Sequence, residues 1–162
     1  EKIVLETFVP KNKTEIEELW KSRKMLNNAQ KLEGPSIKHD ISIPIEKIPQ
    51  FVKLIEKKLK NIVDKNKIVI FGHLADGNLH YNIGKSEKIG MQEFERMRKR
   101  INKIVFDVVF SFNGSFSAEH GIGKFKIKEL YKYSDKKEFE LKKQIKDLLD
   151  PKNIMNPGKI FY

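Results

Sequence analysis

The hydrophobic periods along the 162 residues predict an α+β fold with a ferredoxin-like βαββαβ core. Three observations lead to this prediction. Strand and helical periods alternate in that order over residues 37–118, an Asp-Gly pair at 76–77 joins two strands as a hairpin, and no repeat or low-complexity linker interrupts the pattern. We expect an antiparallel sheet with helices packed on it, an extra strand and helix in front, and a helix behind. The whole chain, 1–162, is expected to be one domain.

A strand and a helix are predicted in front of the core. Residues 3–9, IVLETFV, are typical of a strand, and Pro10 ends it. Thr14 and Glu17 match the T-x-x-E capping box that begins many helices. Apolar residues follow at helical spacing, and Arg23 lies beside their stripe.

The first half of the core contains three strands and a helix. Residues 37–44 alternate as a strand with two faces, one carrying Ile37, His39, Ile41 and Ile43 and the other Lys38, Asp40 and Ser42. Residues 48–59 carry an apolar stripe at helical spacing. Residues 67–73 are β-branched and apolar, which predicts a buried strand. The turn residues 74–77 lead into its partner strand, 78–84.

The second half of the core contains a long helix and a short strand. Apolar residues from 94 to 108 recur at helical spacing, and Asn113 with Gly114 ends that helix. Residues 114–120 predict a last strand that runs into a glycine-rich turn. Leucine and isoleucine residues between 141 and 149 mark a closing helix, which an Asp-Pro pair ends.

The composition limits the classes of function. The chain has 33 basic and 22 acidic residues, a net charge of +11, but nearly all of the positive charge is lysine on helical faces, so we expect no nucleic-acid partner. No apolar run approaches the roughly 18–20 residues of a membrane span, and the first residues do not form a secretion signal. The absence of cysteine excludes disulfides and thiolate chemistry and agrees with a cytoplasmic location.

Three of the four histidines fall in two short glycine-bearing segments. His73 and His80 lie on either side of the Asp-Gly turn, and His120 follows Glu119 in FSAEHGIGK. Cross-strand neighbours are close enough for two imidazoles to share a metal, and Asn82 shares the face of His80. Two imidazoles and a carboxylate suit Zn²⁺, Mn²⁺ or Co²⁺. Ordinary surface histidines would explain an isolated pair, but not the accompanying asparagines, carboxylate and glycine turns.

Two other interpretations of these segments are weaker. Gly121-x-Gly123-Lys124 lacks the spacing of a phosphate-binding loop. The βαββαβ order and the basic charge would also fit an RNA-recognition motif. That module needs stacking aromatic residues on its strands, where this sequence has His and Asn.

Three segments in order carry a resemblance to a known family. GHLADGNLHYNI, GSFSAEHGIGKFKIKEL and DPKNIMNPGKIF resemble the C-terminal domain of FAD-linked oxidases of the vanillyl-alcohol-oxidase superfamily. Among its members the chain is most similar to D-2-hydroxyacid dehydrogenases, which act on D-2-hydroxyglutarate or D-lactate, and to the glycolate oxidase FAD subunit. LWKSRKMLNNAQ and IKHDISIPIEKIPQFV resemble upstream segments of the same family, so the resemblance covers nearly the whole chain.

The resemblance implies a role for each matching residue. The metal ligands would be His73, His80 and Glu119, and the active-site base would be His120. The substrate would be bound by Arg23, Lys38 and Asn82, of which the first two match positions that grip carboxylates. The implied cofactors are FAD and a divalent metal, with Zn²⁺ expected first and Mn²⁺ or Co²⁺ as alternatives.

The implied reaction is oxidation of a small 2-hydroxyacid to the 2-oxoacid. In it, the histidine base takes the hydroxyl proton, the metal stabilises the developing alkoxide, and a hydride passes to flavin. No part of the sequence matches an FAD-binding domain, so this partner would lie elsewhere in the same chain or on a separate one. Alone, the chain is expected to be inactive. The alternative is a metal-binding or interaction module without enzymatic activity.

Overall fold

The computed structural model describes residues 6–161 and divides the chain into two compact units, Glu1–Ser36 and Ile37–Tyr162. Each unit is described by itself. The expectation that residues 1–162 form one domain stays a prediction.

The first unit consists mainly of helix α1, Lys13–Leu32. Asn12, not Thr14, caps it: the Asn12 side chain accepts a hydrogen bond from the Glu15 backbone N–H at 3.0 Å and donates one to the Glu15 carboxylate at 2.8 Å. The predicted capping box is therefore displaced by two residues. The predicted strand at 3–9 lies partly outside the described residues, and its described part, 6–9, is not a strand.

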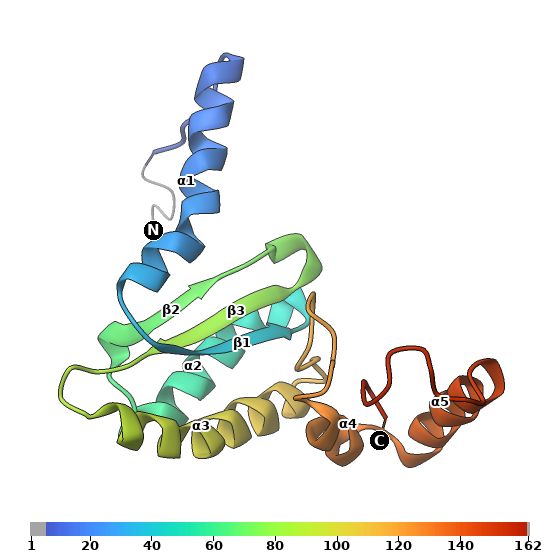
Figure 1. Ribbon diagram of the computed structural model, residues 1–162. Coiled ribbons are helices and arrows are strands. Elements are labelled where there is room, and N and C mark those ends of the chain that lie inside the picture. Colours follow the sequence, from blue (N-terminus) through green and yellow to red (C-terminus); the bar gives the residue numbers. More distant parts are fainter. Residues whose placement is uncertain (1–5, 162) are drawn as a thin grey trace. The chain divides into compact units, whose positions relative to one another are not determined.

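The second unit is built on a three-stranded sheet, which together with its helices confirms the α+β class (Figure 1). The strands are β1 (Ser36–Ser42), β2 (Ile68–Phe71) and β3 (Asn78–Gly84), in the spatial order β1-β3-β2. β2 and β3 form an antiparallel hairpin in which Phe71 faces His80. This order is that of the first three strands in a ferredoxin-like motif.

Two helices, α2 (Ile48–Leu59) and α3 (Met91–Ser111), cover one face of the sheet (Figure 1). The expected helical stripes are buried there against alternate residues of β1 and β3. The core consists of Ile37, Ile41, Ile43, Phe51, Ile55, Leu59, Leu79, Tyr81, Ile83, Phe94, Ile101, Val105, Phe106, Val108 and Val109. Because side chains alternate along a strand, the other face of the sheet carries the polar residues.

The edges of the sheet differ from the prediction. β2 is shorter than the predicted 67–73 and is an edge strand, with Val69 exposed rather than buried. The predicted strand at 114–120 is reduced to one antiparallel bridge between Ser42 and Ser115. That bridge still lies beside β1, where a ferredoxin-like motif places its fourth strand.

The C-terminal part of this unit has two helices where one was predicted. α5, Lys136–Leu149, matches the expected closing helix, and Asp150 follows it. α4, Ile127–Tyr133, was not predicted. Three short 3-10 turns, η1 (Ile45–Lys47), η2 (Lys65–Lys67) and η3 (Leu74–Asp76), connect the elements of the core. Among the described residues, no helix is long and apolar enough to cross a membrane.

Candidate metal and substrate site

The polar face of the sheet gathers the candidate residues. β1 contributes Lys38 and Asp40, and β3 contributes Asn78, His80 and Asn82. These residues alternate with core residues, so the periodicity that buries one face directs them to the opposite one. The ring of Phe71 on β2 lies 5.0 Å from that of His80 and limits where the imidazole can move.

The turn before β3 holds His73 against this face. A Cβ on Gly72 would lie 2.1 Å from the Asn78 carbonyl oxygen, so only glycine permits this approach of the two chains. The His73 backbone N–H donates to the Asn78 side-chain oxygen at 3.3 Å. Gly77 ends the turn in the left-handed region (φ 64°), and its carbonyl accepts from the Ile43 backbone N–H at 2.9 Å. Hydrogen bonds thus join the turn to β3 and to Ile43, the residue that follows β1.

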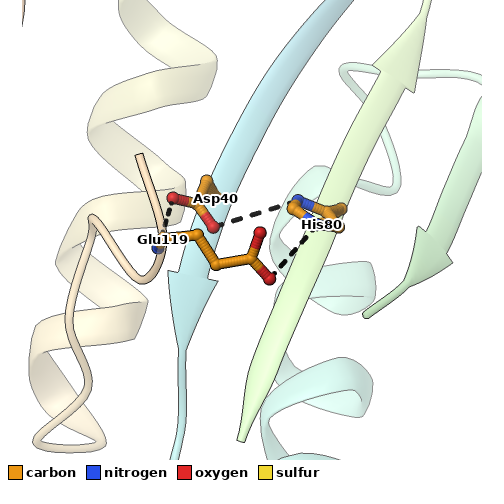
Figure 2. A group of neighbouring side chains, drawn as sticks. All are labelled: Asp40, His80 and Glu119. Carbon is orange, nitrogen blue, oxygen red and sulfur yellow. Dashed lines mark hydrogen bonds and ion pairs between the residues drawn. The ribbon is translucent and has the colours of Figure 1, made fainter. Parts of the chain in front are cut away.

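Glu119 brings the three predicted metal ligands together. Its Oε1 lies 3.4 Å from His73 Nε2 and 3.9 Å from His80 Nε2. Figure 2 shows the Glu119 carboxylate pointing toward the His80 ring. Ligands about 2.0–2.2 Å from one tetrahedral metal are themselves separated by roughly 3.4 Å. Glu119 meets this spacing with His73 and nearly meets it with His80, but among the described residues the group whose ligand atoms all lie within 4.8 Å of one another is Asp40, His80 and Glu119, so His73 would have to move closer to His80. The donor types fit a divalent metal, and the identity of the ligands stays a prediction.

Asp40 is a central residue that the sequence analysis did not select. It is only 4% exposed, and together with His80 and Glu119 it forms a cluster of possible metal-binding groups (Figure 2). Its Oδ2 accepts the backbone N–H groups of both Glu119 and His120 at 2.9 Å, and its Oδ1 accepts from Asn78 Nδ2 at 3.0 Å. Burial alone would raise the pKa of Asp40, but these hydrogen bonds and nearby positive charges lower it below its usual value. Asp40 is therefore a carboxylate.

His120, the predicted base, lies beside the metal ligands and is accessible. Its ring lies 5.8 Å from the ring of His80, nearly parallel to it, and 67% of its side chain is exposed. Its Nδ1 is 3.5 Å from Asp40 Oδ2. If Nδ1 carries the proton toward that carboxylate, Nε2 is left with a lone pair that can accept a proton from a bound molecule.

The three predicted substrate-binding residues differ in position. Lys38 is exposed and shares the face of β1 with Asp40. Asn82 is buried, and its side-chain oxygen accepts from the His39 backbone N–H at 3.3 Å. Arg23 lies on α1, in the other unit. All three roles stay predictions.

Lys126 supports the loop that carries Glu119. Its Nζ donates to the Phe116 carbonyl oxygen at 2.8 Å and lies 3.3 Å from Ser117 Oγ. Burial lowers the pKa of Lys126, and the negative charges of Asp40 and Glu129 oppose that shift. The sequence analysis missed this contact, because a lysine within a lysine-rich segment carries no distinguishing signal.

A comparison with models of known protein families shows to which family this chain belongs. Residues 1–160 match the model described as FAD linked oxidases, C-terminal domain. The chain belongs to this family.

Curated relatives agree with the FAD-linked oxidase assignment. D-2-hydroxyglutarate dehydrogenase of Stutzerimonas stutzeri is 39% identical over 158 residues, which are 98% of this chain and 34% of that protein. The protein of the same name from Xanthomonas citri is 34% identical over 89% of this chain and 30% of its own length. The mitochondrial D-2-hydroxyglutarate dehydrogenase of Danio rerio is 36% identical over 97% of this chain and 28% of its own length. The chain thus spans about a third of the relatives it matches.

Proposed function

We propose that this chain is the substrate- and metal-binding C-terminal part of a flavin-dependent D-2-hydroxyacid dehydrogenase. The observation that carries the proposal is the position of the Glu119 carboxylate, 3.4 Å from His73 and 3.9 Å from His80, in a chain of the FAD-linked oxidase family. The ring of His120 lies 5.8 Å from that of His80. The substrate is a D-2-hydroxyacid of the D-2-hydroxyglutarate, D-lactate or glycolate type. The names of the curated relatives favour D-2-hydroxyglutarate among these.

The proposed metal centre uses the Nε2 atoms of His73 and His80 and the Glu119 carboxylate. Two imidazoles and one carboxylate leave coordination positions open, as in catalytic zinc sites, so Zn²⁺ is the first choice and Mn²⁺ or Co²⁺ the alternatives. The metal, when bound, would supply a Lewis acid for the hydroxyl and carboxylate oxygens of the substrate.

The protein side chains bind the substrate and move its hydroxyl proton. His120 accepts that proton on Nε2, while Asp40 holds the Nδ1 side of the ring and stabilises the imidazolium that forms. Lys38 and Arg23 pair with substrate carboxylates, and Asn82 lines the polar face near the substrate. FAD, when bound, would supply the acceptor for the hydride from the substrate carbon.

The remaining partner is an FAD-binding domain, in the same chain or on another. Two observations support such a domain. The matched relatives are about three times as long as this chain. In addition, α5 carries exposed apolar side chains that a partner domain could cover, with Leu148 80% and Leu149 71% exposed. We propose that the chain is inactive without that domain. A cytoplasmic location is proposed from the sequence, although some relatives carry the word mitochondrial in their names.

A chimera tests this function. The chain replaces the matching C-terminal third of the Stutzerimonas stutzeri relative, and flavin reduction is followed with D-2-hydroxyglutarate, D-lactate and glycolate. We expect reduction by at least one of them, loss of activity after chelation, and recovery with Zn²⁺, Mn²⁺ or Co²⁺. A chimera that retains its FAD and binds metal but reduces no flavin would contradict the proposal and favour a metal-binding module without enzymatic activity.

A further inference from the structure

The three ligand-bearing segments come from separate parts of the chain. His73 lies in the turn after β2, His80 lies on β3, and Glu119 lies in the loop after the Ser42–Ser115 bridge. Because a single bridge takes the place of the fourth strand, no sheet ladder in the described chain fixes Glu119. Beyond the bridge, the Ala118 backbone N–H donates to the Asp40 carbonyl at 3.3 Å, and side-chain contacts are needed to set the distance of Glu119 from the two histidines.

One chain of hydrogen bonds joins all three segments. The His73 backbone N–H donates to Asn78 Oδ1 at 3.3 Å, and Asn78 Nδ2 donates to Asp40 Oδ1 at 3.0 Å. Asp40 Oδ2 then accepts the backbone N–H groups of Glu119 and His120, each at 2.9 Å. Both linking side chains are almost fully buried, with Asp40 4% and Asn78 2% exposed. Buried hydrogen bonds of this kind are costly to break because the separated groups are left without water.

The positions around His80 favour a supporting role for Asp40 over a ligand role. Glu119 approaches Nε2 of the His80 ring at 3.9 Å, whereas Asp40 approaches Nδ1, also at 3.9 Å. A metal held by Glu119 and His73 would bind Nε2, with Asp40 on the far side of the ring. Both Asp40 oxygens already accept protein hydrogen bonds. Carboxylates on the distal nitrogen of a metal-binding histidine orient the ring.

We propose that Asp40 and Asn78 are a positioning pair that holds the three ligand-bearing segments at coordinating distance. This inference rests on the metal centre of the proposed function. The pair sets the spacing through two side chains, and neither binds the metal. Its contribution is therefore measurable on metal affinity with all three ligands unchanged.

The test titrates the 162-residue chain with Co²⁺ and follows the visible d–d absorption, together with the amide NMR signals of Glu119 and His120. Asp40→Asn replaces one acceptor oxygen by a donor, and we expect 10–100-fold weaker Co²⁺ binding and shifted amide signals even without metal. The double variant Asp40→Asn with Asn78→Asp restores a donor opposite an acceptor. It gives up the 3.4 Å contact of Asn78 to the Ile41 carbonyl and the negative charge of Asp40 beside His80 and His120. We expect it to recover much of the lost affinity.

Asp150→Asn is the matched control. Asp150 is also a buried carboxylate that accepts two backbone N–H groups, from Ile154 and Met155 at 2.9 Å, and it pairs with Lys146. We expect this variant to lose stability while Co²⁺ affinity stays within about twofold. If circular dichroism shows that Asp40→Asn does not fold, Asn78→Ala is used in its place, because it also removes the hydrogen bond between Asn78 and Asp40.

The outcomes separate the two proposals. The positioning role would be contradicted if Asp40→Asn bound Co²⁺ with wild-type affinity, or if the double variant bound Co²⁺ no more tightly than Asp40→Asn. Neither result would contradict the proposed metal centre. A wild-type chain that binds no Co²⁺ would overturn the metal centre and the pair with it.

Discussion

His39 is a buried histidine of the core, separate from the three at the candidate site. Its Nδ1 lies 2.8 Å from the Tyr81 carbonyl oxygen and its Nε2 lies 3.0 Å from the side-chain amide of Asn102. Burial lowers the pKa of His39 from 6.5 to about 4, although these hydrogen bonds oppose the shift. The ring is therefore neutral in the folded protein at pH 7 and links β1 to β3 and α3.

This lowered pKa makes stability depend on pH. Unfolded chains take up a proton at His39 below pH 6.5, whereas the folded chain resists until about pH 4, so stability from this residue is present above pH 6.5 and is lost as the pH falls. Between pH 7 and 5 the loss is about 2 kcal/mol. Urea unfolding at the two pH values should show this difference in the wild type and a difference smaller by that amount in His39→Gln. An equal pH dependence in both would contradict a neutral His39.

The proposed roles at the site predict different kinetics for different residues. In the active chimera, His120→Ala should lower kcat by about 10²–10⁴-fold, because a general base acts in the transition state. Arg23→Ala or Lys38→Ala should chiefly raise KM, through the loss of a charge-assisted hydrogen bond worth roughly 1.5–3 kcal/mol. Steady-state kinetics of the three variants side by side measure this. Near-normal kcat in His120→Ala would show that the base lies elsewhere.

At the scale of elements, the β2–β3 hairpin depends on Gly77. Its φ is 64°, and an added Cβ would lie 2.2 Å from the Ile43 carbonyl oxygen, which is backbone and cannot move aside cheaply. Gly77→Ala should lower the free energy of unfolding by about 2 kcal/mol or more and displace the turn that carries His73. Gly158, with φ 67° and open space around it, is the control: Gly158→Ala should cost only about 1 kcal/mol. Equal losses in the two variants would contradict the packing argument.

The elements with strong periods were predictable from the sequence. The stripes of α2 and α3 and the alternation of β1 and β3 correspond to buried faces, because burial of apolar side chains sets these patterns. The start of α1 was misplaced by two residues because Asn12 competes with Thr14 for the same capping role. The last strand is only a bridge at Ser115, because tertiary contacts rather than local propensity decide where a short polar segment pairs.

At the scale of the whole molecule, the sequence singled out Glu119 and the two histidines near it, but not Asp40, which accepts hydrogen bonds from the loop of Glu119. Histidines are few in this sequence, and His73 and His80 stand out because they lie beside a glycine turn. Glu119 stands out because it precedes His120 and a second glycine turn. Asp40 does not stand out, because its hydrogen bonds go to backbone N–H groups 79 and 80 residues away, and such bonds leave no period or motif in the sequence. The one available signal was an Asp on the polar face of a predicted strand.

The central claim is that a divalent metal binds between His73, His80 and Glu119, and anomalous diffraction tests it most directly. Crystals of the 162-residue chain are grown with Zn²⁺, and data are collected on both sides of the zinc absorption edge. We expect one strong anomalous peak about 2.0–2.2 Å from the Nε2 atoms of His73 and His80 and from a Glu119 oxygen. A peak on the Nδ1 side of His80 beside Asp40, or no peak within reach of these three side chains, would contradict the account.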